Sequence, residues 1–348
     1  MRNSRIVVVI TAIAALLATT VGCAASNDDT AGGTHVFAEP EAGAYPVTLQ
    51  HAYGSTTIDA QPKRVVVIGW SGADIAVDLG TVPVAQGTAA SSAGGSYYPW
   101  FKEAVEKLGA PLPAVDESLE RGEVDLEYVL SQQPDLILAV NSGITEKEYN
   151  RLSEIAPTVA FPGEAWSASA EEHVEIIGKA LGRPTKAAEI RRDLTATLAR
   201  TGADHPELAG KTFISGFAPG DDGQSIVFST TDARVQTLVE LGMRPLPAAV
   251  DLQHAAGDPS SFNVSLEQLL PLAPDLFLTV STRAELDEVG RTHTAFARWA
   301  PIADNRVALI EDKNVGLAFS TATPLGLRWG LPQIVSALSA AAKTPARP

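Results

Sequence analysis

The sequence predicts an α/β protein made of two small lobes that are joined by a single long helix. Strand and helix signals alternate from about residue 46 onwards. Residues 125–140 recur as residues 265–280, with eight identical positions and no gap. Between the two copies, residues 185–201 form a helical pattern that would span roughly 25 Å, and the inter-lobe helix is expected over residues 185–203. Alternation of strands and helices on both sides of such a helix favours two lobes over one continuous sheet.

The elements expected before and after this helix follow from local patterns. A hairpin is expected over residues 47–58, and the apolar run that follows Lys63 and Arg64 predicts a buried strand. Ser169 and Glu172 have the spacing of a capping box, which predicts the start of another helix. Further predicted segments are a helix over 72–79, a strand over 82–86, a helix and strand over 149–161, and a strand after Gly210.

The repeated unit reads DLEYVLSQQPDLILAV in its first copy and SLEQLLPLAPDLFLTV in its second. Asp125 and Ser265 are typical N-cap residues, and each opens a short helix with a glutamate in its first turn. A Pro-Asp turn follows in both copies and leads into an apolar run of the kind found in buried parallel strands. We interpret the Pro-Asp turn as structural, and each predicted lobe then presents one equivalent glutamate, Glu127 or Glu267.

The N-terminus predicts export. Basic residues precede about twelve apolar positions, too few for a bilayer span of about 20. The only cysteine, Cys23, follows Gly22 in a segment that resembles a bacterial lipobox, although Thr20 stands where leucine is usual. The resemblance implies that Cys23 is lipidated; the alternative is an ordinary signal peptide with an incidental cysteine. The expected organisation is a lipoprotein signal peptide over 1–22, a flexible tether over 23–45, lobes over 46–184 and 204–348, and the helix between them.

Composition restricts the partners. The chain has 348 residues and a formal net charge of −15, which disfavours nucleic acid and anionic lipid surfaces as partners. An anionic ligand would therefore need a local positive pocket. With one cysteine, no intramolecular disulfide can form, and a hydrophobic content of 45% is ample for a core.

Several residues are candidates for chemistry. The turn Gly69-Trp70-Ser71-Gly72-Ala73 resembles the nucleophile elbow of α/β-hydrolases, but Ala73 replaces the final glycine of that motif. Beyond His254 and His293, no acid–histidine order accompanies the serine. Tyr97 and Tyr98 are hard oxygen donors for ferric iron, although an aromatic wall of a ligand cleft is favoured because no ligand cluster accompanies them. We assign no metal site, no cofactor and no catalytic residue. Glu127 and Glu267 either stabilise a helix dipole or form a pseudo-symmetric docking pair.

Four motifs resemble the periplasmic binding proteins that carry ferric siderophores, haem or vitamin B12 to ATP-driven importers. These motifs are KRVVVIGW at 63–70, the repeated unit, YNRLSEIAPTVAF at 149–161 and WAPIADNRVALIED at 299–312. The resemblance implies two α/β lobes joined by a rigid helix, with cargo held between the lobes. It also implies that Glu127 and Glu267 meet arginines on the two permease subunits of an ABC importer, and that the protein is no enzyme.

Within this class the sequence is most similar to the iron-siderophore branch, in which arginines and aromatic rings hold anionic ferric chelates. The resemblance implies that Arg234 and Arg283 bind the anion, although each lies about one position away from the matching arginine of the family. Asn141-Ser142-Gly143 stands where catecholate binders often place another arginine, which argues against a tris-catecholate cargo. The expected aromatic contacts are Trp70, Tyr97, Tyr98 and Trp166. Haem, with Tyr97 or Tyr98 as axial ligand, and cobalamin remain alternative cargoes. An α/β-hydrolase that acts on siderophore esters, with Ser71 as its nucleophile, is the alternative from another class of protein.

Overall fold

The computed structural model describes residues 36–87, 95–118, 124–166 and 169–345. The expected signal peptide, Cys23 and most of the expected tether lie outside these residues. The first lobe holds a parallel five-stranded sheet in the order β5-β4-β3-β6-β7. Its strands are β3 (Val65–Val67), β4 (Ala85–Gly87), β5 (Ala114–Asp116), β6 (Leu136–Leu138) and β7 (Thr158–Val159).

Helices cover this sheet, and a hairpin adds to the lobe. The helices are α1 (Gly72–Asp78), α2 (Pro99–Lys107), α3 (Leu126–Ser131), α4 (Glu146–Ser153) and α5 (Ala170–Ala180). The predicted hairpin is confirmed as β1 (Val47–His51) and β2 (Gly54–Ile58), paired antiparallel. The predicted capping box of Ser169 and Glu172 is also confirmed at the start of α5.

The second lobe repeats the plan with a parallel sheet in the order β10-β8-β12-β13. Its strands are β8 (Thr212–Ser215), β10 (Arg244–Pro245), β12 (Leu276–Val280) and β13 (Val307–Ile310). Strands β9 (Gln224–Phe228) and β11 (Ser261–Ser265) form a separate antiparallel pair. The helices are α7 (Ala233–Glu240), α8 (Pro247–Ala255), α9 (Leu266–Leu269), α10 (Arg283–Thr292), α11 (Ala300–Ala303), α12 (Lys313–Thr321) and α13 (Pro324–Ala342), with 3₁₀ turns at Pro206–Leu208 and Phe296–Arg298.

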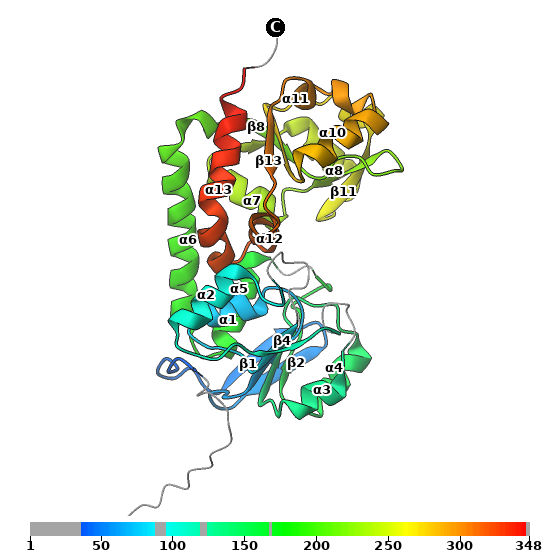
Figure 1. Ribbon diagram of the computed structural model, residues 1–348. Helices are drawn as coiled ribbons and strands as arrows, with labels where there is room; N and C mark the ends of the chain where they lie inside the picture. Colours follow the sequence, from blue (N-terminus) through cyan, green and yellow to red (C-terminus); the bar gives the residue numbers. More distant parts are fainter. Residues whose placement is uncertain (1–35, 88–94, 119–123, 167–168, 346–348) are drawn as a thin grey trace, which may run out of the picture. The chain divides into compact units, whose positions relative to one another are not determined.

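Two long helices run alongside each other (Figure 1). Helix α6 (Pro184–Asp204) links the two lobes along the chain, as the sequence predicts. Helix α13 belongs to the second lobe by sequence, yet it also contacts α1 and α2 of the first lobe. Its Trp329 packs against the hydrophobic cores of both lobes. None of the helices in the described part of the chain combines the length and apolar character needed to cross a membrane.

The tether expected over 23–45 is wrong for its last ten residues, because residues 36–45 pack on the first lobe. Val36 and Phe37 contact its core, and the Tyr45 hydroxyl donates to the Ala180 carbonyl at 3.0 Å. The Glu41 carboxylate accepts hydrogen bonds from the first backbone N–H groups of α6, including that of Lys186 at 3.0 Å. Val36, Phe37 and Tyr45 do not recur with the period of a helix or a strand, so no sequence pattern predicted that this segment packs on the lobe.

Candidate ligand site and docking surface

The Pro-Asp turns are structural in both lobes, as the sequence predicts. Asp135 accepts hydrogen bonds from the backbone N–H groups of Lys63 and Arg64, both at 2.7 Å. Asp275 accepts from the backbone and the hydroxyl of Thr212, at 2.7 and 2.8 Å. Each aspartate therefore ties the repeated unit to the start of the first sheet strand of its own lobe.

The repeated helices carry their glutamates at the surface. The Asp125 carboxylate caps α3 by accepting from the N–H of Glu127 at 3.0 Å, and Ser265 caps α9 by accepting from Gln268 at 3.3 Å. Glu127 and Glu267 are both exposed, and no salt bridge between described residues involves either carboxylate. Both side chains are therefore accessible to a partner from the first turn of a capped helix.

Two exposed tryptophans lie at the carboxyl edge of the first sheet. Trp70 follows β3 and is 43% exposed, and Trp166 follows β7 and is 49% exposed. The loop after β6 holds both residues, because the backbone N–H of Trp70 donates to the Asn141 carbonyl at 2.9 Å and the backbone N–H of Trp166 donates to the Ser142 carbonyl at 3.1 Å. This edge is where open parallel sheets usually bind ligands. The loop at 141–143 thus serves as a platform that holds the backbones of both tryptophans.

Glycine is required at both ends of this platform. Gly69 has φ +92°, and a Cβ there would lie 2.1 Å from the Asn141 carbonyl oxygen. The Trp166 indole packs on Gly143, where a Cβ would lie 2.3 Å from Nε1. The close approach of these backbones explains why the chain carries glycine at the two positions.

Tyr97 and Tyr98 have packing partners of their own. The Tyr97 hydroxyl donates to the Pro113 carbonyl at 2.5 Å, and burial raises the pKa of Tyr97. The Tyr98 ring stacks on Trp100 with centroids 4.6 Å apart. Both rings lie partly buried against the first-lobe core. Their contact with cargo stays a prediction, and among the described residues no cluster of His, Cys, Asp and Glu has the geometry of a metal site.

Arg234 lies in an aromatic cluster of the second lobe. Its guanidinium stacks 3.3 Å above the ring centroid of Phe228, which in turn contacts the exposed ring of Phe217 edge-on at 5.2 Å. Asp232 pairs with the guanidinium through two hydrogen bonds of 2.8 and 2.6 Å. Asp232 had not been predicted from the sequence as a partner of Arg234. Its carboxylate neutralises much of the positive charge that Arg234 would otherwise offer to an anionic cargo.

Sequence reasoning also missed Phe217, which is 40% exposed. The signal was present: KTFISGF at 211–217 and KRVVVIGW at 63–70 both end in a glycine followed by an aromatic residue. A Cβ on Gly216 would lie 2.2 Å from the Ile226 carbonyl oxygen, much as a Cβ on Gly69 would lie 2.1 Å from that of Asn141. Phe217 is therefore the second-lobe counterpart of Trp70.

Arg283 occupies a different position from Arg234. Its backbone N–H donates to Glu311, which follows β13, at 2.8 Å, while its guanidinium donates to Asn305, which precedes β13, at 3.2 Å. The side chain is thus directed along β13 towards the amino end of that strand. In the described part of the chain, Arg234 contacts Asp232 and Phe228 whereas Arg283 bonds to Glu311 and Asn305, and we regard Arg234 as the stronger candidate for cargo.

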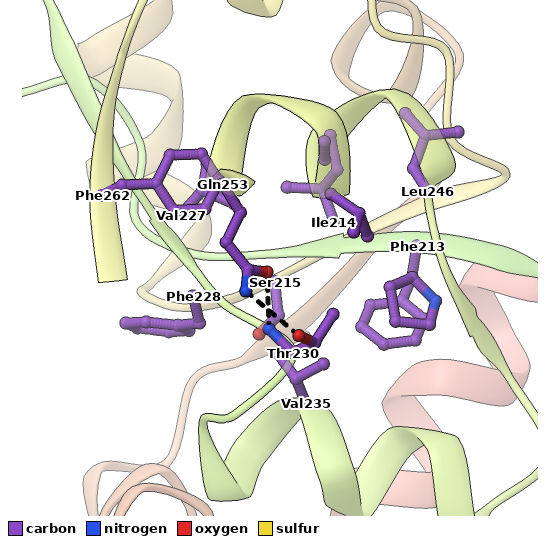
Figure 2. Close-up of a pocket in the computed structure, with 13 residues that line it drawn as sticks. Phe213, Ile214, Ser215, Val227, Phe228, Thr230, Val235, Leu246, Gln253 and Phe262 are labelled. Carbon is purple, nitrogen blue, oxygen red and sulfur yellow. Dashed lines mark hydrogen bonds between the residues drawn. The ribbon is translucent and has the colours of Figure 1, made fainter. Parts of the chain in front are cut away.

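A partly open cavity of about 20 Å³ in the second lobe is too small for a metal chelate. Figure 2 shows Gln253 and Thr230 within its lining, joined by hydrogen bonds of 2.9 and 3.1 Å. The other lining residues are mostly apolar. This cavity is a packing feature of the lobe, and the candidate ligand site remains with the aromatic residues at the sheet edges.

The hydrolase interpretation gains no support from the geometry. Ser71 has φ 70° at the start of α1, but among the described residues its hydroxyl forms no hydrogen bond with a histidine or a carboxylate. His173 lies nearby in α5, and burial lowers its pKa to about 3. His254 is exposed and pairs with Asp258 at 2.7 Å. No arrangement of nucleophile, base and acid is formed by these groups.

Two α/β lobes with parallel sheets and a single linking helix define the class III fold of binding proteins. The chain belongs to the periplasmic binding protein family, whose model matches residues 65–313. The fold class expected from the sequence is confirmed.

Three relatives illustrate the similarity. The Fe(3+)-citrate-binding protein YfmC of Bacillus subtilis is 24% identical over 82% of this chain and 83% of its own length. The probable siderophore-binding lipoprotein YfiY of the same organism is 26% identical over 64% of this chain and 65% of its own length. PiaA of Streptococcus pneumoniae, solved in complex with ferrichrome, is 27% identical, with a TM-score of 0.76, over 86% of this chain and all of PiaA.

Proposed function

We propose that this protein is a lipid-anchored, extracytoplasmic binding protein that captures a ferric siderophore and delivers it to an ABC importer. The cargo would contact Trp70 and Trp166 of the first lobe and Phe217 and Arg234 of the second. Glu127 and Glu267 would dock on the two permease subunits, and the ATPase subunits would drive import. In this proposal the protein binds and releases its cargo and catalyses no reaction.

The observation that carries the proposal is the placement of exposed aromatic rings at equivalent points of both lobes. Trp70 and Phe217 each follow the first sheet strand of a lobe, after a glycine that admits a close backbone approach. Large rings left exposed at such an edge are typical of ligand sites. The relatives that bind ferric citrate and ferrichrome support iron chelates as the cargo class.

Tryptophan fluorescence tests the cargo directly. Titration with ferrichrome or ferric citrate is expected to quench emission, because Trp70 and Trp166 are solvent-exposed whereas Trp100 and Trp299 are buried. Replacing Trp70 and Trp166 together by phenylalanine should remove most of the quenching. If haem or cobalamin binds and no ferric chelate changes the emission, the siderophore proposal is wrong and that ligand is the cargo.

Arg234 should matter most for an anionic chelate. We expect Arg234→Ala to weaken ferric citrate binding by about 1–3 kcal/mol, as for one charge-assisted hydrogen bond, and Arg234→Lys to restore only part of it. Neutral ferrichrome should be affected less. The matched variant Asp232→Asn keeps an N-cap residue but frees the guanidinium, so it should tighten ferric citrate binding. If wild type, Arg234→Ala and Asp232→Asn all bind ferric citrate with the same affinity, Arg234 does not belong to the cargo site.

Membrane attachment depends on Cys23 in this proposal. Changing Cys23 to alanine or serine should move the protein from the membrane fraction to the soluble extracytoplasmic fraction, because about 20 apolar residues would be needed for a spanning anchor. Fractionation followed by immunoblotting measures this. Retention of the Cys23→Ala protein in the membrane would contradict lipidation at this position.

A further inference from the structure

Two exposed leucines occupy equivalent positions in the repeated units. Leu130 is 58% exposed and Leu270 is 38% exposed. No other leucine in the described part of the chain is as exposed as these two. Single exposed apolar side chains are ordinary on protein surfaces. A matched pair, one in each lobe and both within a repeated unit, calls for an explanation.

Each leucine lies beside a docking glutamate. Glu127 and Leu130 are three residues apart in α3, and the same spacing joins Glu267 to Leu270 at α9. Residues at this spacing share one side of a helix. The neighbouring positions Val129 and Leu269 are 0% and 1% exposed, so the opposite side of each helical turn is anchored in its lobe.

The fold accounts for the other identical positions of the repeated unit. The aspartates hold the turn to the first strand, and the remaining apolar positions of the helix and strand pack in the cores of the two lobes. Pro134 and Pro274 precede the aspartates in the turn. Among the described residues, the side chains of the recurring glutamate and of the exposed leucine take part in no hydrogen bond, salt bridge or core cluster that would require them in both copies.

We propose that Glu127 with Leu130 and Glu267 with Leu270 form two equivalent docking pairs, each a carboxylate beside an apolar anchor. This inference rests on the proposed function and specifies its docking surface. The partner would present, on each of two related permease subunits, a basic side chain next to an apolar depression that receives the leucine. A partner built from two related halves fits a surface that is repeated once per lobe.

Charge argues against the other possible occupants of this surface. A second copy of this chain would bring the same acidic pairs together, and the net charge of −15 opposes self-association. An anionic membrane would be repelled for the same reason. In the proposed interface the glutamates would speed encounter, whereas the leucines would slow dissociation by excluding water around the charges.

The test compares uptake with cargo binding in the full-length protein. Leu130→Ser, Leu270→Ser and the double variant are expressed in cells that lack the chromosomal copy, and initial uptake of ⁵⁵Fe-ferrichrome and ⁵⁵Fe-citrate is measured at matched protein levels. We expect each single variant to reduce uptake several-fold and the double variant to reduce it about tenfold or more, since a buried leucine contributes strongly to an interface. Affinity for the iron chelate, measured by tryptophan fluorescence, should stay within about twofold of wild type.

The control is Val239→Ser, which changes another exposed apolar residue, 45% exposed on α7, outside the repeated unit. Cells that express this variant should take up both iron chelates at the wild-type rate. Wild-type uptake by the double leucine variant would overturn the docking pairs and leave the proposed function intact. Failure of the wild-type protein to bind or to support uptake of either chelate would overturn the proposed function, and the docking pairs with it. Loss of chelate binding in the leucine variants would also overturn the inference, because it would place these leucines in cargo binding.

Discussion

Replacing Glu127 and Glu267 together by alanine is expected to reduce uptake of the iron chelate by at least about tenfold while leaving its affinity almost unchanged. Both carboxylates are exposed in the first turn of capped helices. They have no salt-bridge partner among the described residues, so their removal should cost the folded protein little. The measurements are the initial rate of uptake in cells and the chelate affinity of the purified protein.

Each single variant should have an intermediate effect, because each lobe contributes one carboxylate. The matched control is the double variant Glu106→Ala and Glu288→Ala, which removes two exposed glutamates from α2 and α10 and so changes the net charge equally. Normal uptake by the Glu127 and Glu267 variant, or an equal loss in the control, would refute a specific docking role for these residues.

The second large effect concerns Asp74, a carboxyl group buried where α13 meets the first lobe. Asp74 is 2% exposed, and its Oδ2 accepts hydrogen bonds from Trp100 Nε1 at 2.6 Å and from Thr323 Oγ1 at 3.0 Å. Thr323 is the N-cap of α13. Burial raises the pKa of Asp74 to about 7, and the nearby carboxylate of Asp78 adds to the rise.

The raised pKa makes stability depend on pH. The unfolded chain releases the Asp74 proton near pH 3.8, whereas the folded protein holds it up to about pH 7. Between these values the folded state binds more protons, so its stability falls as pH rises, and the loss is complete above about pH 7. The contribution of protonated Asp74 to the free energy of unfolding is therefore complete only below the pKa of the unfolded state, near 3.8.

We therefore expect Asp74→Asn to gain stability relative to wild type as pH rises. Asparagine keeps an acceptor oxygen for Trp100 and Thr323 and carries no charge. The difference in free energy of unfolding between variant and wild type should shift by about 3 kcal/mol in favour of the variant between pH 5 and pH 8. Urea denaturation at both pH values measures this shift. For the exposed control Asp59→Asn, the free energy of unfolding should change between pH 5 and pH 8 as it does for wild type. If the free energy of unfolding of Asp74→Asn changes with pH by the same amount as that of wild type, a raised pKa of Asp74 is refuted.

Local sequence patterns were enough to predict the fold class and most elements. The repeated unit, the capping box of Ser169 and the periodicity of residues 185–203 depend on neighbours along the chain, and the structure confirms all three. The structural role of Asp135 and Asp275 was predicted for the same reason. A turn leading into a buried strand needs a residue that holds the backbone at that point.

The site was predicted only in part because its contacts join residues distant in the chain. Trp70 and Trp166 are brought to one platform by backbone hydrogen bonds to residues 141 and 142. Phe217 had a sequence signal in the glycine-aromatic ending that it shares with Trp70. The pairing of Arg234 with Asp232 and the orientation of Arg283 towards Asn305 depend on side-chain conformation, which no periodicity specifies.

The sequence by itself determined the two-lobe α/β organisation and the equivalence of Glu127 and Glu267, because hydrophobic periodicity, caps and turn residues act over a few neighbouring positions. Only the tertiary structure decided that residues 36–45 pack on the first lobe, that α13 contacts both lobes, and that Asp74 is buried between them. Burial and pKa depend on which distant segments exclude water from a side chain, and that is fixed only when the whole chain has folded.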